Sequence, residues 1–203
     1  MTIKISAMSA AMALGGTEKI ECVQSSATAY LTPAQIETYI AGLGRTFAKD
    51  AGLWWPLASS AVGVSCPADT SEDILATITV PAGAIGANGQ LRIWQLWSCT
   101  NNANSKTMRV RLGGVSGTQF LNAGVASIAS WQNVTIIRNR NSQSSQIGYA
   151  NNQGTPFAIT TTTNQTGAVD TSASQDIVIS GQKGTAGDAL TLEAYMVELY
   201  YKA

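Results

Sequence analysis

Few residues of this chain have the types and spacing that chemistry requires. Ser180 and Lys183 have the S-x-x-K spacing of a serine nucleophile with a lysine partner, but the companion motifs of such enzymes are absent and the segment is glycine-rich. The run Gly113–Gly117 follows an expected strand, yet it lacks the lysine and the helix of a phosphate-binding loop. We therefore expect turns at both places rather than catalytic or phosphate-binding sites.

Acid–base and metal chemistry also lack their usual residues. The sequence contains no histidine, which removes the commonest proton shuttle, the Ser-His-Asp triad and most transition-metal sites. Glu72 and Asp73 are sequence neighbours, and Glu193 and Glu198 are an odd number of residues apart, so we expect the latter two to face opposite sides of a strand. The cysteines show no C-x-x-C spacing, which indicates free thiols in a reducing cytoplasm, with neither a metal site nor a cofactor.

The composition indicates one globular core under an unusually uncharged surface. Of 203 residues, 45% are hydrophobic and 12% are charged, against about 25% charged in an ordinary soluble domain. The formal net charge is zero, and no run approaches the roughly 18 apolar residues of a membrane span. We expect neither nucleic-acid binding nor membrane insertion. The N-terminal stretch is broken by Ser6 and Ser9 and is poor in leucine, so we expect no signal peptide.

The basic residues are concentrated in a segment without acids. Residues 74–169 contain no aspartate or glutamate. We expect the basic side chains there to pair with acids of neighbouring strands or subunits. The basic residues are Arg92, Lys106, Arg109, Arg111, Arg138 and Arg140. The acids expected to pair with Arg109, Arg111, Arg138 and Arg140 are Asp176, Glu193 and Glu198.

The alternative is that four of these arginines contact an anionic partner. Strand alternation over Thr107–Leu112 turns Arg109 and Arg111 outward together, and Arg138 and Arg140 share a parity at the end of another strand. Arginine suits such a contact because its planar fork binds phosphate or carboxylate through two hydrogen bonds.

The segment SATAYLTPAQIETYIAGL predicts a short helix after a β-hairpin. The hairpin is expected from the alternating runs Glu18–Gln24 and Thr28–Leu31. Thr32 and Gln35 form a capping box, and Pro33 takes the first helical position. A helix shorter than about 12 to 15 residues is marginal alone, so its apolar stripe needs a docking partner. The stripe consists of Ile36, Tyr39, Ile40 and Leu43.

The remainder of the chain consists of short alternating runs between clusters of Gly, Asn, Ser and Thr. We expect a mainly β fold: an N-terminal module of hairpin and helix over 1–45, a connector over 46–65, and an eight-stranded antiparallel jelly-roll sandwich over 66–203. The expected strands are Ile74–Val80, Leu91–Cys99, Thr107–Leu112, Trp131–Arg138, Gln146–Tyr149, Phe157–Thr161, Gln175–Ser180 and Ala189–Tyr201.

Two of these strands, Leu91–Cys99 and Ala189–Tyr201, are apolar on both faces. A sandwich buries only one face of each sheet, so we expect a neighbouring subunit to cover the other. The alternative is a loop or the N-terminal module folded over the sheet. The residues expected at the subunit interface are Trp94, Leu96, Tyr195, Val197, Leu199 and Tyr201.

The segment ISAMSAAMALGGTEKIECVQSSATAYLTPAQIETYI resembles the N-terminal module of many tailed-bacteriophage fibre and appendage proteins. That module carries a run I-S-x-L-x-x-A, a G-T-E, a V-V-Q-x-G-x-T hairpin and T-x-x-Q-I-x-x-Y-I. Cys22 and Ser26 depart from the hairpin pattern. The matching positions are Ile5, Ser6, Ala11, Gly16, Thr17, Glu18, Val23, Gln24, Thr28, Thr32, Gln35, Ile36, Tyr39 and Ile40.

The segment LRIWQLWSCTNNANSKTMRVRLGG and the apolar C-terminal strand look like the jelly-roll knobs that such proteins carry as homotrimers. The resemblance implies a non-enzymatic virion protein that is assembled in the host cytoplasm. Its N-terminal stripe would anchor it to other virion proteins of the capsid or tail. Its β domain would project, with a role in attachment to host glycan or lipopolysaccharide.

Three other functions fit parts of the sequence. A capsid decoration protein, such as a cement protein or head fibre, would use the same fold to strengthen the shell. A fibre-borne polysaccharide depolymerase lacks support from histidine or an aligned acidic pair. A free carbohydrate-binding module, with asparagine-rich loops on the sugar, leaves the N-terminal module unexplained.

Overall fold

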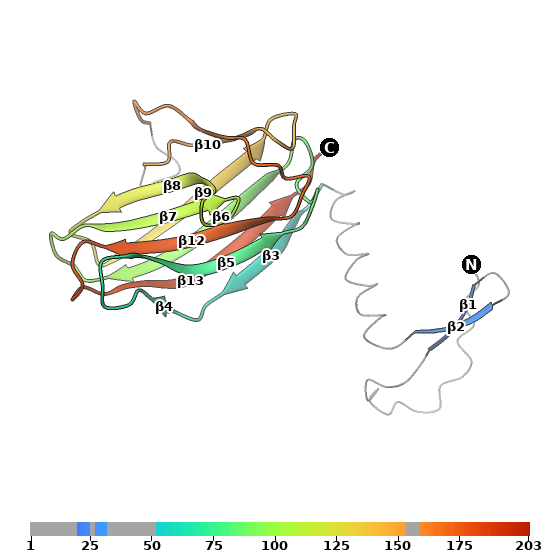
Figure 1. Ribbon diagram of the computed structural model, residues 1–203, viewed down its shortest axis with the longest axis horizontal. Coiled ribbons are helices and arrows are strands. Elements are labelled where there is room, and N and C mark those ends of the chain that lie inside the picture. Colours follow the sequence, from blue (N-terminus) through green and yellow to red (C-terminus); the bar gives the residue numbers. More distant parts are fainter. Residues whose placement is uncertain (1–19, 25–26, 32–51, 153–158) are drawn as a thin grey trace. The chain divides into compact units, whose positions relative to one another are not determined.

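The computed structural model describes four ranges of the chain (Figure 1). The chain divides into two compact units, Met1–Ala51 and Gly52–Ala203. No helix of the described residues is long and apolar enough to span a bilayer. The described ranges are 20–24, 27–31, 52–152 and 159–203.

The N-terminal unit contains the expected hairpin. β1 (Ile20–Gln24) pairs antiparallel with β2 (Ala27–Leu31), and Cys22 lies opposite Ala29 at the centre of the register. The prediction of a hairpin at this position is therefore confirmed. The helix expected after it lies outside the described residues, as does its stripe of Ile36, Tyr39, Ile40 and Leu43.

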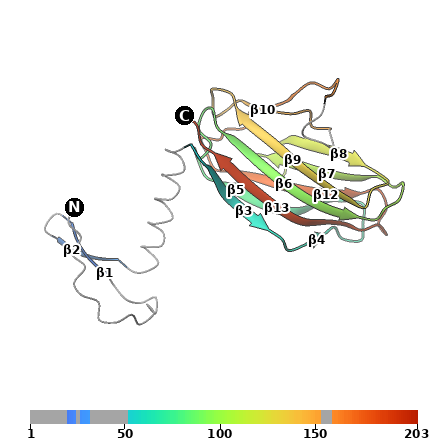
Figure 2. The ribbon, with the colours of Figure 1, turned by 180° about the vertical axis from the view of Figure 1, so that it is seen from behind.

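The C-terminal unit consists of two antiparallel sheets, which confirms the expectation of a mainly β protein. Figure 1 shows the four-stranded sheet in front, and Figure 2 shows the seven-stranded sheet from behind. The smaller sheet has the order β5 (Glu72–Val80), β12 (Gln175–Lys183), β7 (Lys106–Leu112), β8 (Thr118–Val125). The larger sheet has the order β11 (Gln165–Gly167), β10 (Gln146–Gly148), β9 (Ser130–Asn139), β6 (Gln90–Cys99), β13 (Leu190–Tyr200), β3 (Trp54–Ser60), and β4 (Val64–Ser65) also pairs with β13.

One hydrophobic core is shared by the two sheets. Alternate residues of β6 and β7 supply it, as the period of two in their sequences predicts. The side chains between them exclude water almost completely, and burial of this kind is the main favourable contribution to folding. Its largest fully buried apolar members include Leu91, Ile93, Trp97, Met108, Leu112, Ile177, Ile179, Leu190 and Leu192.

Seven of the eight expected strands have counterparts. These are β5, β6, β7, β9, β10, β12 and β13, with ends that differ by a few residues. Over the eighth, Phe157–Thr161, residues 159–161 form no strand and 157–158 lie outside the described residues. The segment 46–65, which we expected to be a connector, contains β3 and β4 of the larger sheet. β8 and β11 were not expected.

A bulge in β13 changes which residues of that strand face the core. The register shifts between Leu192 and Ala194, so Glu193 is the extra residue. Leu192 and Val197 are therefore both buried in the core, although they are an odd number of residues apart. A regular strand would have turned one of them outward.

A second bulge places the Phe120 ring against two glycines of neighbouring strands. The register of β7 and β8 shifts between Val110 and Arg111, and Phe120 is buried there beside Leu121. A Cβ atom on Gly148 or Gly167 would lie 2.9 Å from the Phe120 ring. Both positions therefore need a residue without a side chain.

We predict that Gly167→Ala destabilises the protein by about 1 to 3 kcal/mol, the usual cost of overpacking a core. The three atoms nearest to the new methyl group are side-chain atoms of Phe120 and Thr118, so the cost should fall in a Phe120→Leu background. Denaturant unfolding followed by tryptophan fluorescence measures both effects. Gly124→Ala is the matched control, because no atom lies within 4 Å of its added Cβ. Equal costs in the two backgrounds would contradict the proposed contact.

Candidate interaction surfaces

The outer face of the larger sheet is apolar at its centre. Leu96 of β6 lies opposite Ala194 of β13, and Trp94 lies opposite both Met196 and, on the other side, Val134 of β9. Leu96 is 42% exposed and Met196 is 36% exposed. We call these five residues the apolar face: Trp94, Leu96, Val134, Ala194 and Met196.

Two of the charges beside the apolar face, those of Arg92 and Glu198, neutralise each other. Arg92 forms an ion pair with Glu198 at 2.7 Å, and the Trp94 indole N–H donates to the same carboxylate at 3.0 Å. The Arg92 guanidinium lies 4.1 Å from the centre of the Trp54 ring and 5.7 Å from that of Trp94. This part of the sheet therefore presents aromatic surface with little net charge.

The structure divides the residues that we expected at a subunit interface. Trp94 and Leu96 do point outward from β6, opposite to the core residue Ile93. Val197 and Leu199 instead lie in the core of their own chain, because the bulge at Glu193 reverses the alternation of β13. Tyr195 and Tyr201 also pack against that core. Sequence reasoning missed Met196, which points outward in their place.

Arg109 and Arg111 lie together on the outer face of the smaller sheet, but both form ion pairs with a glutamate of the same chain. The Glu72 carboxylate contacts both guanidinium groups. Arg111 donates to it through two nitrogens, and Arg109 Nη1 lies 3.3 Å from Glu72 Oε2. Ser180 donates to Glu72 Oε1 at 2.5 Å. Glu72 was not among the acids expected to pair with these arginines. Glu72 and Asp73 directly precede the acid-free segment. Only the strand order β5–β12–β7 brings Glu72 close to Arg109 and Arg111.

Of the other basic residues in the acid-free segment, two form ion pairs and two are exposed without one. Arg92 pairs with Glu198 of the neighbouring strand, and Lys106 pairs with Asp188. Arg138 and Arg140 are exposed, and neither forms an ion pair within the described part of the chain. Of the four arginines considered for an anionic partner, these two are therefore the accessible ones.

The residues considered for catalysis do not meet. Ser180 is bound to Glu72, whereas the Lys183 ammonium donates to the Ala186 carbonyl at 3.1 Å. Glu193 and Glu198 both lie on the outer face, which corrects the expectation of opposite faces, again because of the bulge. Glu193 accepts a hydrogen bond from Ser98, whereas Glu198 pairs with Arg92, which lies six residues away along β6. At the rise of a strand this separation is about 20 Å.

Cys66 and Cys99 lie in surroundings that disfavour the reactive thiolate form. Burial and the neighbouring Asp73 carboxylate raise the pKa of Cys66 to about 12, and burial also raises the pKa of Cys99. Among the described residues, no group of three or more histidine, cysteine, aspartate or glutamate side chains could hold a metal ion.

We predict that the Glu72 ion pairs make stability depend on pH. The hydrogen bond from Arg111 lowers the pKa of Glu72 below its ordinary value of 4.5. A lowered folded-state pKa contributes stability above the unfolded-state value, and that contribution is lost as the pH falls through the folded-state pKa. Glu72→Gln should therefore lower the melting temperature at neutral pH and converge with the wild type in acid. Asp69→Asn, at an exposed neighbour, is the control. A Glu72→Gln deficit that persists unchanged at low pH would contradict the assignment.

Comparison with known proteins gives no relative from which a function can be taken. No family model matches the sequence, and no curated protein matches it. Among solved structures, the chain is similar to a chain of "Structure of infectious bursal disease virus Gx strain", with 9% sequence identity and a TM-score of 0.26. The match covers 88% of this chain and 44% of that chain, so this chain spans less than half of that viral chain. A likeness at this TM-score carries no argument about fold or function.

Proposed function

We propose that the chain is a non-enzymatic structural subunit of a tailed-bacteriophage virion, in which the C-terminal unit forms a homotrimer and the N-terminal unit anchors it to the particle. The proposal joins two supports. The N-terminal sequence resembles the anchoring module of phage appendage proteins, and its hairpin is present as β1 and β2. The apolar face of the larger sheet is the observation that carries the oligomeric part.

We further propose that the C-terminal unit is a jelly roll. Its eight longest strands are β3, β5, β6, β7, β8, β9, β12 and β13. When these are counted from one to eight along the chain, the sheets have the orders 1-8-3-6 and 2-7-4-5. First pairs with last, second with seventh, third with sixth and fourth with fifth, as in a long hairpin rolled into two layers. This order supports a jelly roll of two Greek keys.

We assign the apolar face to contact with a neighbouring subunit of the trimer. Central strands that expose Leu96 and Met196 at diagonal positions leave apolar area in water. Aromatic and methionine side chains are enriched at the centres of subunit interfaces. The ion pair of Arg92 and Glu198 lies at the edge of this face and is already neutral, so it can enter an interface without an unpaired charge.

We predict that the wild-type chain sediments as a trimer and that Leu96→Glu together with Met196→Glu gives a folded monomer. A carboxylate at either position would be buried without a partner in the interface, and this costs more than the contact contributes. Sedimentation velocity gives the oligomeric state, and far-ultraviolet circular dichroism verifies folding.

The matched control is Ile74→Glu. Ile74 is 49% exposed on β5 of the smaller sheet, so the substitution changes charge and hydrophobicity alike but should leave a trimer. A monomeric wild type, or dissociation by Ile74→Glu alone, would contradict the assignment of the apolar face.

We predict that Ile36→Ser with Ile40→Ser prevents incorporation into particles without destabilising the C-terminal unit. Each buried side chain of this size contributes about 1.5 to 3 kcal/mol, which is large for a small docking surface. Complementation of a phage lacking the gene, followed by quantification of the protein on purified particles, measures incorporation. The main melting transition should stay unchanged, because Ile36 and Ile40 belong to the N-terminal unit and not to the C-terminal one. Wild-type occupancy of the double variant would place the anchor elsewhere.

Attachment to a host is assigned to the exposed arginines rather than to the paired ones. Arg138 and Arg140 are free of ion pairs with described residues, whereas Arg109 and Arg111 share Glu72. Exposed charges of this kind suit a phosphate-rich or carboxylate-rich surface such as lipopolysaccharide.

Labelling the protein on particles in electron micrographs distinguishes a fibre or spike from a protein that decorates the capsid.

A further inference from the structure

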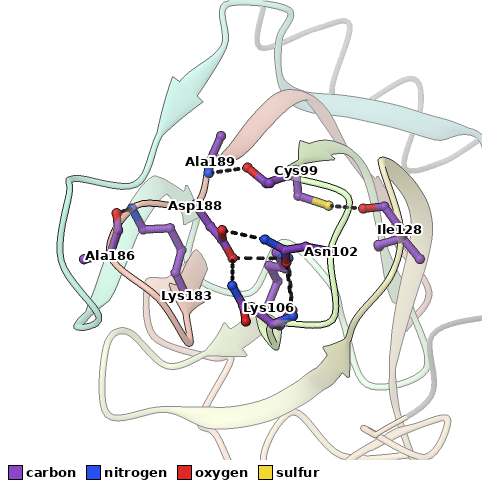
Figure 3. Close-up of polar contacts among 10 residues, drawn as sticks. Cys99, Asn102, Lys106, Ile128, Lys183, Ala186, Asp188 and Ala189 are labelled. Carbon is purple, nitrogen blue, oxygen red and sulfur yellow. Dashed lines mark hydrogen bonds and ion pairs between the residues drawn. The ribbon is translucent and has the colours of Figure 1, made fainter.

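Lys106 is fully buried where the β6–β7 connection ends, and its ammonium lies among three oxygen atoms (Figure 3). Its Nζ donates to Asn102 Oδ1 at 2.5 Å and to the Asn104 carbonyl at 2.9 Å, and it lies 3.4 Å from Asp188 Oδ2. The side chains of Lys106 and Asp188 are 0% and 7% exposed. A buried amine and a buried carboxylate therefore meet the amide of Asn102, which is half-buried.

The Asn102 amide has its orientation fixed by its neighbours. Oδ1 accepts a second hydrogen bond, from the Asn104 backbone N–H at 3.0 Å, while Nδ2 donates to Asp188 Oδ1 at 2.8 Å. Exchanging the oxygen and nitrogen would set donor against donor and the amide oxygen against the carboxylate. The Asn102 carbonyl is thus polarised by two hydrogen-bond donors, Lys106 Nζ and the Asn104 N–H. The Asn102 amide nitrogen contacts Asp188, which can supply it with a proton.

We propose that Lys106 and Asn102 join in an intramolecular isopeptide bond, with Asp188 transferring the protons. The reaction is an acyl transfer from the amide nitrogen of Asn102 to the side-chain nitrogen of Lys106. It needs no cofactor, oxidant or reductant, because an amine and a primary amide become a secondary amide and ammonia.

The proton transfers balance within the three side chains. Asp188 takes a proton from the Lys106 ammonium, which leaves a neutral amine. The lone pair of that amine forms a bond to Cγ of Asn102, and the carbonyl electrons move onto Oδ1. The bond from Cγ to Nδ2 then breaks as Asp188 passes a proton from the attacking nitrogen to Nδ2. The carbonyl re-forms, and the released ammonia takes the first proton from Asp188 and departs as ammonium, so Asp188 is again a carboxylate.

Three features of the site favour this reaction over an ordinary hydrogen bond. The reacting groups are held in contact by the fold, which replaces a collision between molecules. The Asn104 backbone N–H is aimed at the oxygen on which negative charge develops. Asp188 lies 3.4 Å from the Lys106 Nζ through Oδ2 and accepts from Asn102 Nδ2 at 2.8 Å through Oδ1, so one carboxylate contacts both the nitrogen that loses a proton and the nitrogen that gains one.

Lys183 shows what a buried lysine without this chemistry looks like. It lies opposite Lys106 in the register of β12 and β7 and is also buried. Its Nζ donates to the backbone carbonyl of Ala186, seen in Figure 3, and this peptide carbonyl has no side-chain nitrogen to release. Lys183 is therefore the matched control for Lys106.

Mass spectrometry of the purified full chain tests the proposal. Loss of ammonia lowers the intact mass by about 17 Da. Trypsin cleaves after an unmodified lysine but not after an acylated one. We expect a single tryptic peptide running from Ile93 to Arg109, lighter by the mass of ammonia and uncleaved after Lys106, with the bond to Asn102 located by fragmentation.

The variants separate this bond from other losses of ammonia. Lys106→Met should have its full calculated mass, Asp188→Asn should show a smaller cross-linked fraction, and Lys183→Met should keep the bond. A folded wild type with its full mass and complete cleavage after Lys106, even after prolonged incubation, would overturn the proposal. A lighter wild type that trypsin still cleaves after Lys106 would also overturn it, because cyclisation of an asparagine to a succinimide loses the same mass and leaves the lysine free.

Discussion

The arrangement of the larger sheet depends on the bulge at Glu193. β13 is its longest strand and lies between β6 and β3. Because side chains alternate strictly along a regular strand, Leu190 and Leu192 could not share the core with Val197 and Leu199 without one extra residue. The bulge lets both halves of the strand contribute to the core. It also sets which side chains are left outside, since Met196 and Glu198 point outward only because Val197 points inward.

The same constraint explains which parts of the fold could be predicted from the sequence. Strands that are regular over their length, such as β6 and β7, were predicted almost to the residue, and the outward direction of Trp94 and Leu96 was correct. β8 was missed because its bulge places Phe120 and Leu121 in the core together, which erases the period of two. The faces of β13 were assigned wrongly beyond the bulge for the same reason. Periodicity identifies strands, but a bulge has no composition of its own that reveals it.

The charged sites were less predictable, because ion pairs depend on which strands become neighbours. The absence of acids from residues 74–169 suggested either pairing at a distance or a free basic surface. The pairing of β5 with β12, and of β12 with β7, brings Glu72 across the smaller sheet to Arg109 and Arg111. Nothing local to the arginines indicates this partner. By contrast, Asn102, Asn104 and Lys106 are close in sequence, and only Asp188 comes from elsewhere in the chain.

The two outer faces of the C-terminal unit therefore differ in what they can do. The smaller sheet places one carboxylate between two arginines, so the Glu72 cluster keeps a formal charge of +1 on its outer face. The larger sheet has satisfied its charges at one edge through Arg92 and Glu198 and leaves apolar side chains at its centre. Association through the larger sheet would bury apolar area without breaking an ion pair, whereas association through the smaller sheet would have to desolvate the Glu72 cluster. The asymmetry between the faces gives the proposed trimer one orientation, with the smaller sheets turned outward and each Glu72 cluster remaining in contact with solvent.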